Sequence, residues 1–202
     1  MASSDIKTPV IIGFCGYARC GKDTACDYLI RRTNLQNKKI YSFGDSLRDF
    51  AFHLDSYLPE MKMYYQDVID SYGYEEAKDR FPCFRRHLVK IGDGARRLIS
   101  EDIWLNSVKD KIQKDKADLA LIKDVRYLNE AEFIIKNGGI VVYIDRKDNT
   151  ASNETEKESI RDIVNKLKRN NNFRIVENEG DSVELFYWNL FDAIHEITEI
   201  DN

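Results

Sequence analysis

Residues 10–24 read Val-Ile-Ile-Gly-Phe-Cys-Gly-Tyr-Ala-Arg-Cys-Gly-Lys-Asp-Thr, and this stretch decides the fold. A short apolar run ends in two glycines, Gly16 and Gly21, that bracket four residues; Lys22 and a helical pattern follow at once. This is the spacing of a strand, a phosphate-binding loop and a helix. The glycines allow the loop to curl so that its backbone N–H groups face phosphate oxygens. Lys22 and the helix N-terminus add positive charge to the same place.

The loop therefore predicts an ATP-binding site. Its expected members are Gly16, Ala18, Arg19, Cys20, Gly21, Lys22, Asp23 and Thr24. The position after Lys22, where a hydroxyl often binds Mg²⁺, holds Asp23, and the hydroxyl comes one residue later at Thr24. This order resembles small-molecule kinases of the adenylate kinase type and disfavours a Ras-like GTPase. The alternative is a glycine-rich turn without a ligand, which requires the strand, both glycines and the lysine to coincide by chance.

Length, composition and net charge restrict the classes of protein to which the chain can belong. The chain has 202 residues, 43% of them hydrophobic, and a net charge of −4. This length and apolar content suit one domain with one core. The acidic balance disfavours nucleic acid as a partner. No apolar run approaches membrane-spanning length and residues 1–8 lack a signal-peptide core, so a cytoplasmic protein without a membrane partner is expected.

Four cysteines show neither a CxxC pair nor histidines at metal-ligand spacing. Three of them, Cys15, Cys26 and Cys83, are expected to be small buried residues. Cys20 lies within the loop beside Lys22 and a helix N-terminus, a setting that favours a lowered thiol pKa. Alkylation of Cys20 is therefore expected to block activity, and nucleotide is expected to protect it.

Strand and helix patterns alternate along the chain, which predicts an α/β fold of three layers (α/β/α) around a parallel sheet of about five strands. The expected strands are 9–14, 38–43, 118–124, 139–145 and 173–176. The expected helices are 22–33, 45–57, 82–99, 102–114, 127–137, 155–169 and 181–199. Residues 1–202 are expected to form one P-loop kinase domain, with two departures from simple alternation.

The first departure is residues 44–117, which are too long for a single crossover connection and are expected to form a helical insert. Nucleotide kinases, which the loop resembles, build their acceptor-binding subdomain at this place, so the resemblance implies that the insert binds the phosphoryl acceptor. Its aromatic residues can stack on a base, although core packing is the commoner use of such side chains. The second departure is residues 146–172, a charged segment with almost no apolar stripe. It fits a mobile lid over the phosphates and a solvated surface helix equally well.

Two short motifs follow strands of the expected sheet. Residues 41–48 (Tyr-Ser-Phe-Gly-Asp-Ser-Leu-Arg) resemble the acceptor-binding start of adenylate kinases, in which Asp45 and Arg48 face the incoming monophosphate. A planar guanidinium can hold two phosphate oxygens, whereas the alternative for Arg48 is a solvated helix residue. The strand 118–124 ends in Asp124, which is expected beside the loop strand and, with Thr24, is expected to hold Mg²⁺. Arg126 would then face the transferring or accepting phosphate.

The segment 85–104 carries a wider resemblance. Paired arginines lead into a glycine turn, then an arginine, then an acidic residue two positions before a tryptophan. This order is similar to that of phage-type deoxynucleoside monophosphate kinases. That family also shares the Gly-Lys-Asp-Thr loop, the Asp-Val-Arg strand end at 124–126, an arginine after the fourth strand (Arg146) and an Asn-x-Gly turn (178–180) before the final helix. The resemblance spans nearly the whole chain.

The resemblance implies Mg²⁺-dependent transfer of the γ-phosphoryl group of ATP to a nucleoside 5′-monophosphate, most readily a deoxynucleotide, giving the diphosphate. It implies catalytic roles for Lys22, Arg126 and Arg146, with Arg146 and Arg161 in the lid. The acceptor site it implies consists of Asp45, Arg48, Arg85, Arg86, Arg97, Trp104, Asp124 and Arg126. A homodimer formed through the insert is also compatible with the sequence.

Two other functions stay open at this point. Phosphomevalonate kinases of the animal type and dephospho-coenzyme A kinases share a related loop, so a different phosphorylated metabolite is an alternative acceptor. A nucleotide-binding regulator or ATPase without an acceptor is the alternative from another class. Such a protein would not need the 41–48 motif or the arginine-rich insert, and its ATP hydrolysis would not respond to any monophosphate.

Overall fold

Five parallel strands form the main sheet, with the loop strand at its centre. The strands are β1 (Val10–Cys15), β2 (Lys38–Tyr41), β5 (Leu119–Val125), β6 (Ile140–Arg146) and β7 (Phe173–Asn178), in the spatial order β2-β5-β1-β6-β7. This is a computed structural model that describes residues 8–151 and 154–198. The chain divides into two compact units, residues 43–110 and the remainder, and the sheet belongs to the second of these, here called the sheet unit.

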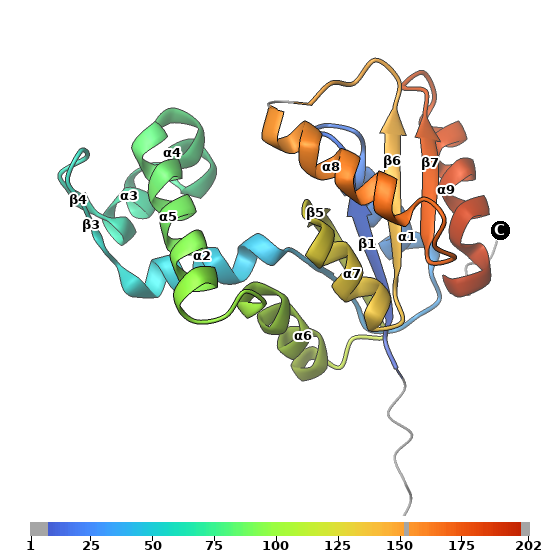
Figure 1. The fold of residues 1–202 in the computed structure, drawn as a ribbon, viewed down its shortest axis with the longest axis horizontal. Helices are drawn as coiled ribbons and strands as arrows, with labels where there is room; N and C mark the ends of the chain where they lie inside the picture. The colour runs from blue at the N-terminus through green and yellow to red at the C-terminus, as the bar shows by residue number, and fades with distance from the viewer. Residues whose placement is uncertain (1–7, 152–153, 199–202) are drawn as a thin grey trace, which may run out of the picture. The chain divides into compact units, whose positions relative to one another are not determined.

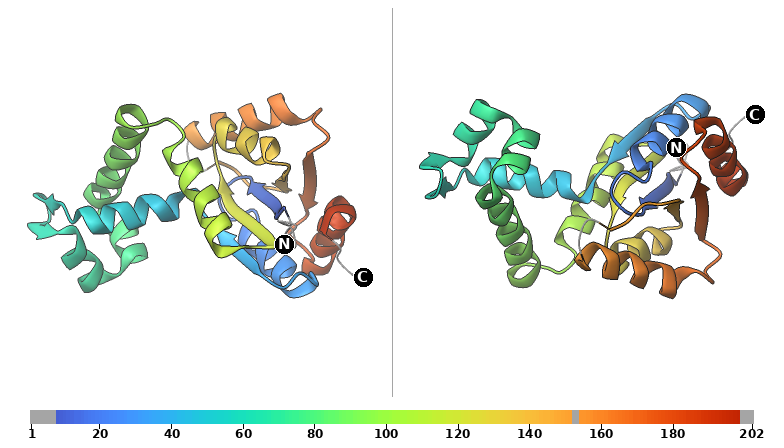
Figure 2. Two further views of the ribbon diagram at one scale, coloured as in Figure 1. Left: turned by 90° about the horizontal axis from the view of Figure 1, so that it is seen from below. Right: turned by 90° about the horizontal axis from the view of Figure 1, so that it is seen from above.

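Helices cover both faces of the sheet. Helices α1 (Lys22–Arg32) and α9 (Val183–Thr198) lie on one face, and α7 (Leu128–Lys136) and α8 (Glu154–Leu167) lie on the other (Figures 1 and 2). Tyr28 of α1 stacks on Tyr187 of α9 with ring centroids 4.4 Å apart. The prediction of a three-layer α/β/α fold around a parallel sheet is confirmed.

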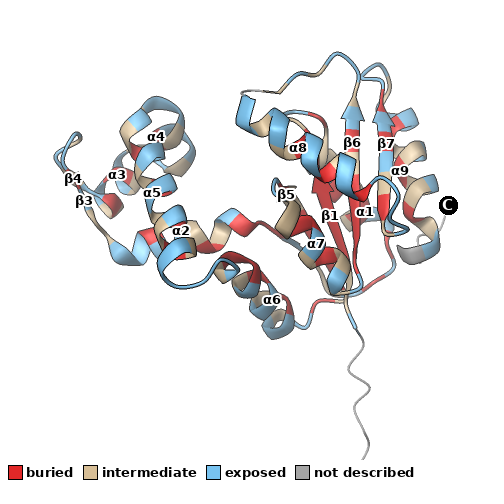
Figure 3. Ribbon diagram, viewed as in Figure 1, coloured by how far each residue is buried: buried red, intermediate tan, exposed pale blue. Residues whose placement is uncertain are grey.

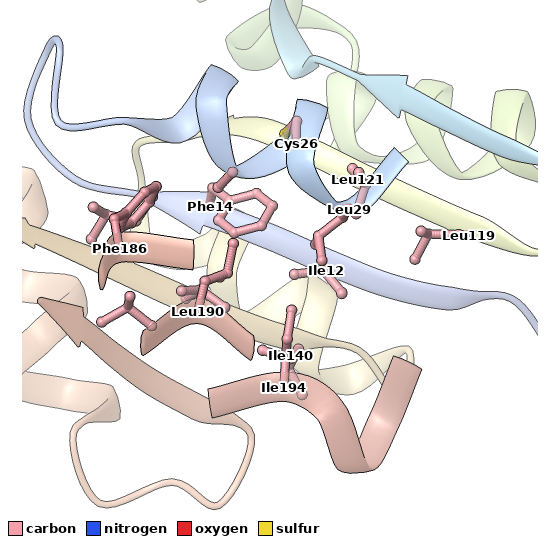
Figure 4. Close-up of a cluster of buried hydrophobic side chains, with 14 of the residues drawn as sticks. Ile12, Phe14, Cys26, Leu29, Leu119, Leu121, Ile140, Phe186, Leu190 and Ile194 are labelled. Carbon is pink, nitrogen blue, oxygen red and sulfur yellow. The ribbon is translucent and has the colours of Figure 1, made fainter. Parts of the chain in front are cut away.

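The core of the sheet unit lies between the sheet and the α1/α9 layer (Figures 3 and 4). Alternating strand residues and the inner faces of the two helices supply it, and its labelled members are Ile12, Phe14, Cys26, Leu29, Leu119, Leu121, Ile140, Phe186, Leu190 and Ile194. Full burial of each large aliphatic or aromatic side chain contributes about 1.5–3 kcal/mol. This packing holds β1 and α1 firmly and so fixes both ends of the loop between them.

Helix α8 differs from the expectation for its segment. Its Ile160, Ile163 and Leu167 are buried, and the helix packs against α7. The expectation that residues 146–172 lack an apolar stripe is therefore wrong. The three residues follow i, i+3, i+7 spacing, which places them on one helical face, but charged residues on the other faces conceal the pattern in the linear sequence.

The second unit, residues 43–110, is mainly helical and has its own core. Its elements are α2 (Phe43–Leu54), β3 (Tyr57–Leu58), β4 (Met63–Tyr64), α3 (Tyr65–Tyr72), α4 (Tyr74–Arg80), α5 (Pro82–Leu98) and the first part of α6 (Ile103–Asp115). Tyr65, Val68, Phe84 and Leu88 are buried within it. This helical unit corresponds to the segment expected as an insert, and its role in acceptor binding stays a prediction.

Across the residues described, no helix has both the length and the apolar composition that crossing a membrane requires.

Candidate active site

The loop from Gly16 to Gly21 joins the carboxyl end of β1 to the start of α1. Ligands of open parallel sheets bind where the strand order reverses, which here is at the carboxyl end of the central strand β1. Gly16 and Gly21 have φ values of 139° and 114°, and Arg19 has a φ of 63°. A side chain at Gly16 would lie 2.7 Å from the carbonyl oxygen of Ile144, so this position requires glycine.

The ammonium of Lys22 lies inside the curl of the loop. Its Nζ donates hydrogen bonds to the carbonyl oxygens of Gly16 and Tyr17, both at 2.8 Å, and lies 3.6 Å from Cys20 Sγ. These contacts hold one positive charge at the amino end of α1, where the helix dipole adds to it. Lys22 therefore lies at the loop, and its contact with phosphate stays a prediction.

One loop amide already binds an anionic group. The N–H of Ala18 donates to Oε1 of Glu156, the third residue of α8, at 3.1 Å. A carboxylate oxygen has the charge and hydrogen-bonding character of a phosphate oxygen, so this contact shows which way the Ala18 amide points and what it attracts. Sequence reasoning missed Glu156, because nothing in a charged helix distinguishes one glutamate from its neighbours.

The predicted lid arginines lie in different surroundings. Arg146, at the end of β6, donates from Nη1 to the carbonyl oxygen of Arg19 at 3.0 Å and therefore contacts the loop backbone directly. Arg161 is exposed on α8. The structure thus brings Arg146 to the loop, while the part that Arg161 plays stays a prediction.

The residues proposed to hold Mg²⁺ have suitable chemistry. Asp124, near the end of β5, accepts a hydrogen bond from Ser42 Oγ at 2.6 Å, and β5 pairs directly with β1 as expected. Thr24 lies in the first turn of α1. A carboxylate and a hydroxyl supply the oxygen ligands that Mg²⁺ prefers, and Mg²⁺ commonly combines one or two such groups with phosphate oxygens and water. Ser42, which orients the Asp124 carboxylate, was not singled out from the sequence.

In residues 8–151 and 154–198, no group of three or more His, Cys, Asp or Glu side chains is arranged to hold a metal ion. Asp23, the carboxylate within the loop motif, is exposed and pairs with Lys123 at 3.4 Å. This ion pair offsets the repulsion that an unpaired carboxylate would exert on phosphates.

Arg126 follows β5 and is exposed, while its backbone is fixed. The buried Glu130 carboxylate accepts hydrogen bonds from the backbone N–H groups of Arg126, at 2.7 Å, and Tyr127, at 3.1 Å. Glu130 therefore caps the N-terminus of α7 and sets the direction in which the chain leaves the strand. The backbone from which the Arg126 side chain extends is therefore fixed.

Cys20 is not the reactive thiol that its neighbours suggested. It is 1% exposed, and burial raises its pKa more than the adjacent Lys22 lowers it. The expectation of a lowered pKa is therefore wrong, because the sequence shows the nearby lysine but not the burial. Cys83, the one free cysteine among the four that is not fully buried, is the better target for alkylation.

The helical unit contains the other predicted acceptor residues. Asp45 and Arg48 form an ion pair within α2, and the Arg48 guanidinium lies over the ring of Tyr74, 4.9 Å from its centroid. Arg86 pairs with Glu60 at 2.7 Å, and Arg85 is exposed on the same helix.

Arg97 lies in an open depression of the surface at the end of α5, together with Asp93, Arg96, Ile99, Ser100 and Glu101. Trp104 is buried, and its indole N–H donates to the carbonyl oxygen of Gly92 at 3.3 Å, so it packs against α5. Tyr65 and Phe84 are also buried, with ring centroids 4.9 Å apart. These three aromatic residues therefore form core, as the sequence favoured, whereas Phe50, Phe52, Tyr57 and Tyr64 of the same unit are exposed.

Together, the strand order, the loop and the lysine after the central strand define the fold of P-loop kinases. A solved dephospho-CoA kinase from Campylobacter jejuni has the same fold, with a TM-score of 0.52 over 94% of this chain and 97% of that one at 16% identity. No protein-family model matches the chain.

Two curated proteins are similar in sequence. One, from Acanthamoeba polyphaga mimivirus, is assigned as a deoxynucleotide monophosphate kinase and is 28% identical over 95% of this chain and its own full length. The other is the deoxynucleoside-5′-monophosphate kinase of Escherichia phage T5, 28% identical over 63% of this chain and half of its own length. These relatives confirm the resemblance drawn from the sequence and the prediction of a kinase enzyme.

Proposed function

We propose that the protein transfers the γ-phosphoryl group of ATP to a deoxynucleoside 5′-monophosphate in the presence of Mg²⁺, giving ADP and the deoxynucleoside diphosphate. The observation that supports this most directly is the loop itself, with the Lys22 ammonium held inside the curl and the Ala18 amide bound to a carboxylate. The names of both curated relatives favour a deoxynucleotide as acceptor.

In this mechanism Lys22 and the loop amides hold the β- and γ-phosphates of ATP. An oxygen of the acceptor phosphate attacks the γ-phosphorus, and the bond from that phosphorus to the β–γ bridging oxygen breaks, so ADP leaves with the electron pair. The acceptor oxygen is largely deprotonated near neutral pH, so no general base is required. Catalysis then consists of alignment and charge neutralisation.

The remaining residues of the proposal are assigned to Mg²⁺, to the transferring phosphate or to the acceptor. Thr24 and Asp124 would hold Mg²⁺, which, when bound, neutralises charge on the β- and γ-phosphate oxygens. Arg126 and Arg146 would contact the transferring phosphate, and a lid that includes Arg161 would exclude water. The residues that we propose for acceptor binding are Asp45, Arg48, Arg85, Arg86, Arg97, Trp104, Asp124 and Arg126. A cytoplasmic location and a homodimer complete the proposal.

The test is a panel of acceptors with ATP, with each product measured by chromatography. The panel holds the four deoxynucleoside monophosphates, the ribonucleotides, phosphomevalonate and dephospho-coenzyme A. Phosphorylation of deoxynucleotides is expected, whereas phosphorylation of another acceptor alone, or ATP hydrolysis indifferent to every acceptor, would overturn the proposal.

The same assay tests the loop. Lys22→Ala is expected to lower turnover by at least about a hundredfold while the protein stays folded, because the phosphate charge loses its main partner. The matched control is Lys166→Ala, which removes an exposed lysine of α8 and should leave turnover unchanged. Near-normal turnover of Lys22→Ala would reject the loop as the ATP site.

A further inference from the structure

Three consecutive carbonyl groups of the loop accept hydrogen bonds from side chains outside it. The pairs and their N···O distances are Asn149 Nδ2 with Ala18 O at 2.9 Å, Arg146 Nη1 with Arg19 O at 3.0 Å, and Asn178 Nδ2 with Cys20 O at 2.9 Å. We call these three side chains the carbonyl clamp. They come from the carboxyl ends of β6 and β7 and from the turn that follows β6.

The clamp has a direct consequence for the loop amides. In a trans peptide the C=O and the following N–H point in opposite directions, so anchoring a carbonyl on one side fixes the next amide on the other. The carbonyls of Ala18 and Cys20 therefore set the directions of the Arg19 and Gly21 amides. Both of these residues have positive φ, 63° and 114°, and alternation of left- and right-handed backbone is what turns successive amides toward one anion.

Asn178 is held most firmly of the three. It is buried, its Oδ1 accepts from the N–H of Gly180 at 3.1 Å, and its backbone carbonyl accepts from the N–H of Lys147 at 3.0 Å. Because Oδ1 is occupied in this way, Nδ2 must face the Cys20 carbonyl. A side chain at Gly21 would meet Nδ2 at 3.0 Å, so the amide group also lies close against the loop backbone.

We infer that Asn149 and Asn178 are positioning residues that preorganise the loop amides for the phosphates of ATP. This inference rests on the proposed function. An unanchored loop would have to adopt the positive φ of Arg19, which is unfavourable for a residue with a side chain, at the moment of binding. The clamp fixes that conformation beforehand, so the amides need no reorganisation when the phosphates arrive. Arg146 is left out of the test because the proposed function already gives it a role at the transferring phosphate.

The experiment compares Asn149→Ala and Asn178→Ala with Asn172→Ala. Asn172 is a matched control: its Nδ2 donates to the carbonyl of Gly139 at 3.1 Å, between the same two strands but at their amino ends, away from the loop. For each protein the Kd for ATP is measured by calorimetry, the KM values for ATP and for the deoxynucleotide acceptor by kinetics, and the Tm by thermal unfolding.

Each clamp variant is expected to bind ATP roughly five- to tenfold more weakly, the change that loss of one hydrogen bond produces. Its KM for the acceptor should stay within about twofold of wild type, and Asn172→Ala should bind ATP normally. Because the Asn178 side chain is buried, its variant can also lose stability; the Asn149 contact is exposed, so Asn149→Ala tests the inference in a protein whose Tm should not change.

ATP affinity of Asn149→Ala equal to that of Asn172→Ala would overturn the inference. A rise in the acceptor KM that matches the rise in the ATP KM would also overturn it, because that pattern indicates general loosening of the site. A wild-type protein that binds no ATP would reject the proposed function itself, so the two failures are distinguishable.

Discussion

Glu156→Gln is expected to tighten the binding of ATP. In the structure the Glu156 carboxylate accepts a hydrogen bond from the Ala18 amide at 3.1 Å. In the proposed function this is a position that a phosphate oxygen of ATP would occupy. ATP must displace this carboxylate before the amide can contact phosphate, and any charge that stays nearby repels the triphosphate. The glutamine keeps the size of the side chain and removes its charge.

The magnitude follows from the strength of that single contact. The hydrogen bond joins a neutral backbone amide to a carboxylate at a solvent-exposed position, and such a bond contributes about 1 kcal/mol. A competing contact of that size weakens the apparent affinity about fivefold, and Glu156→Gln should recover most of this factor. The recovery should shrink at high ionic strength, because salt screens exposed charges.

The assay is calorimetric titration with ATP at low and high salt. Glu158→Gln is the matched control, since it removes the same charge from an exposed position two residues further along α8. If Glu156→Gln binds ATP no more tightly than Glu158→Gln, the carboxylate does not compete with phosphate, and the reasoning fails.

Three further predictions concern the helical unit, and one of them is paired with a comparison at Tyr41 of β2 in the sheet unit. Arg97→Ala should raise the KM for the acceptor about tenfold or more and leave the KM for ATP unchanged. The control Arg80→Ala, which removes an exposed arginine paired with a glutamate one turn away, should change neither KM. If Arg97→Ala changes both KM values equally, the acceptor binds elsewhere. Tyr65→Phe should raise the free energy of unfolding by about 1 kcal/mol, because within the described residues its buried hydroxyl has no hydrogen-bond partner. Tyr41→Phe removes the hydrogen bond from the Tyr41 hydroxyl to the Asp115 carboxylate at 3.0 Å and should lower the free energy of unfolding by a similar amount. Chemical denaturation measures both free energies, and changes of the same sign in the two variants would contradict the prediction. Burial, with a smaller effect of nearby Lys90, lowers the pKa of His87, so the unfolded chain binds the proton more readily and stability should fall as pH drops below about 6.5. His87→Gln should show a shallower loss of stability between about pH 7.5 and 5.5, and an identical slope would exclude His87 as the cause.

The sheet was predictable because its signals are local. Each of the five strands lies within two residues of its predicted bounds at both ends, since buried parallel strands are short apolar runs bounded by polar or glycine residues. Only the carboxyl ends of β2 and β7 differ by as much as two residues. The β3–β4 hairpin was not predicted, because two-residue strands are too short to show a period. The stripe on α8 was missed for another reason: three buried residues among fourteen do not stand out when most of the others are charged.

In the candidate site, too, some features could be predicted from the sequence and others could not. The positions of Gly16, Gly21 and Lys22 follow from spacing along one short segment. In the structure both glycines have positive φ and the Lys22 ammonium bonds to loop carbonyl groups. The raised pKa of the Cys20 thiol could not be predicted from the sequence, because it depends on burial by residues distant in the chain. The effect of this burial on the pKa outweighs that of the adjacent Lys22.

The sequence alone determined that a lysine-bearing, glycine-bounded loop follows a buried strand, because the conformational freedom of glycine and the order of residues along the backbone are local properties. Only the tertiary structure decided which side chains hold that loop. Glu156, Asn149 and Asn178 reach it from 138, 131 and 158 residues away in the chain. They arrive there because β6 lies next to β1 in the sheet, β7 lies next to β6, and α8 packs on α7. This arrangement is set by burial of the core rather than by any pattern near the loop.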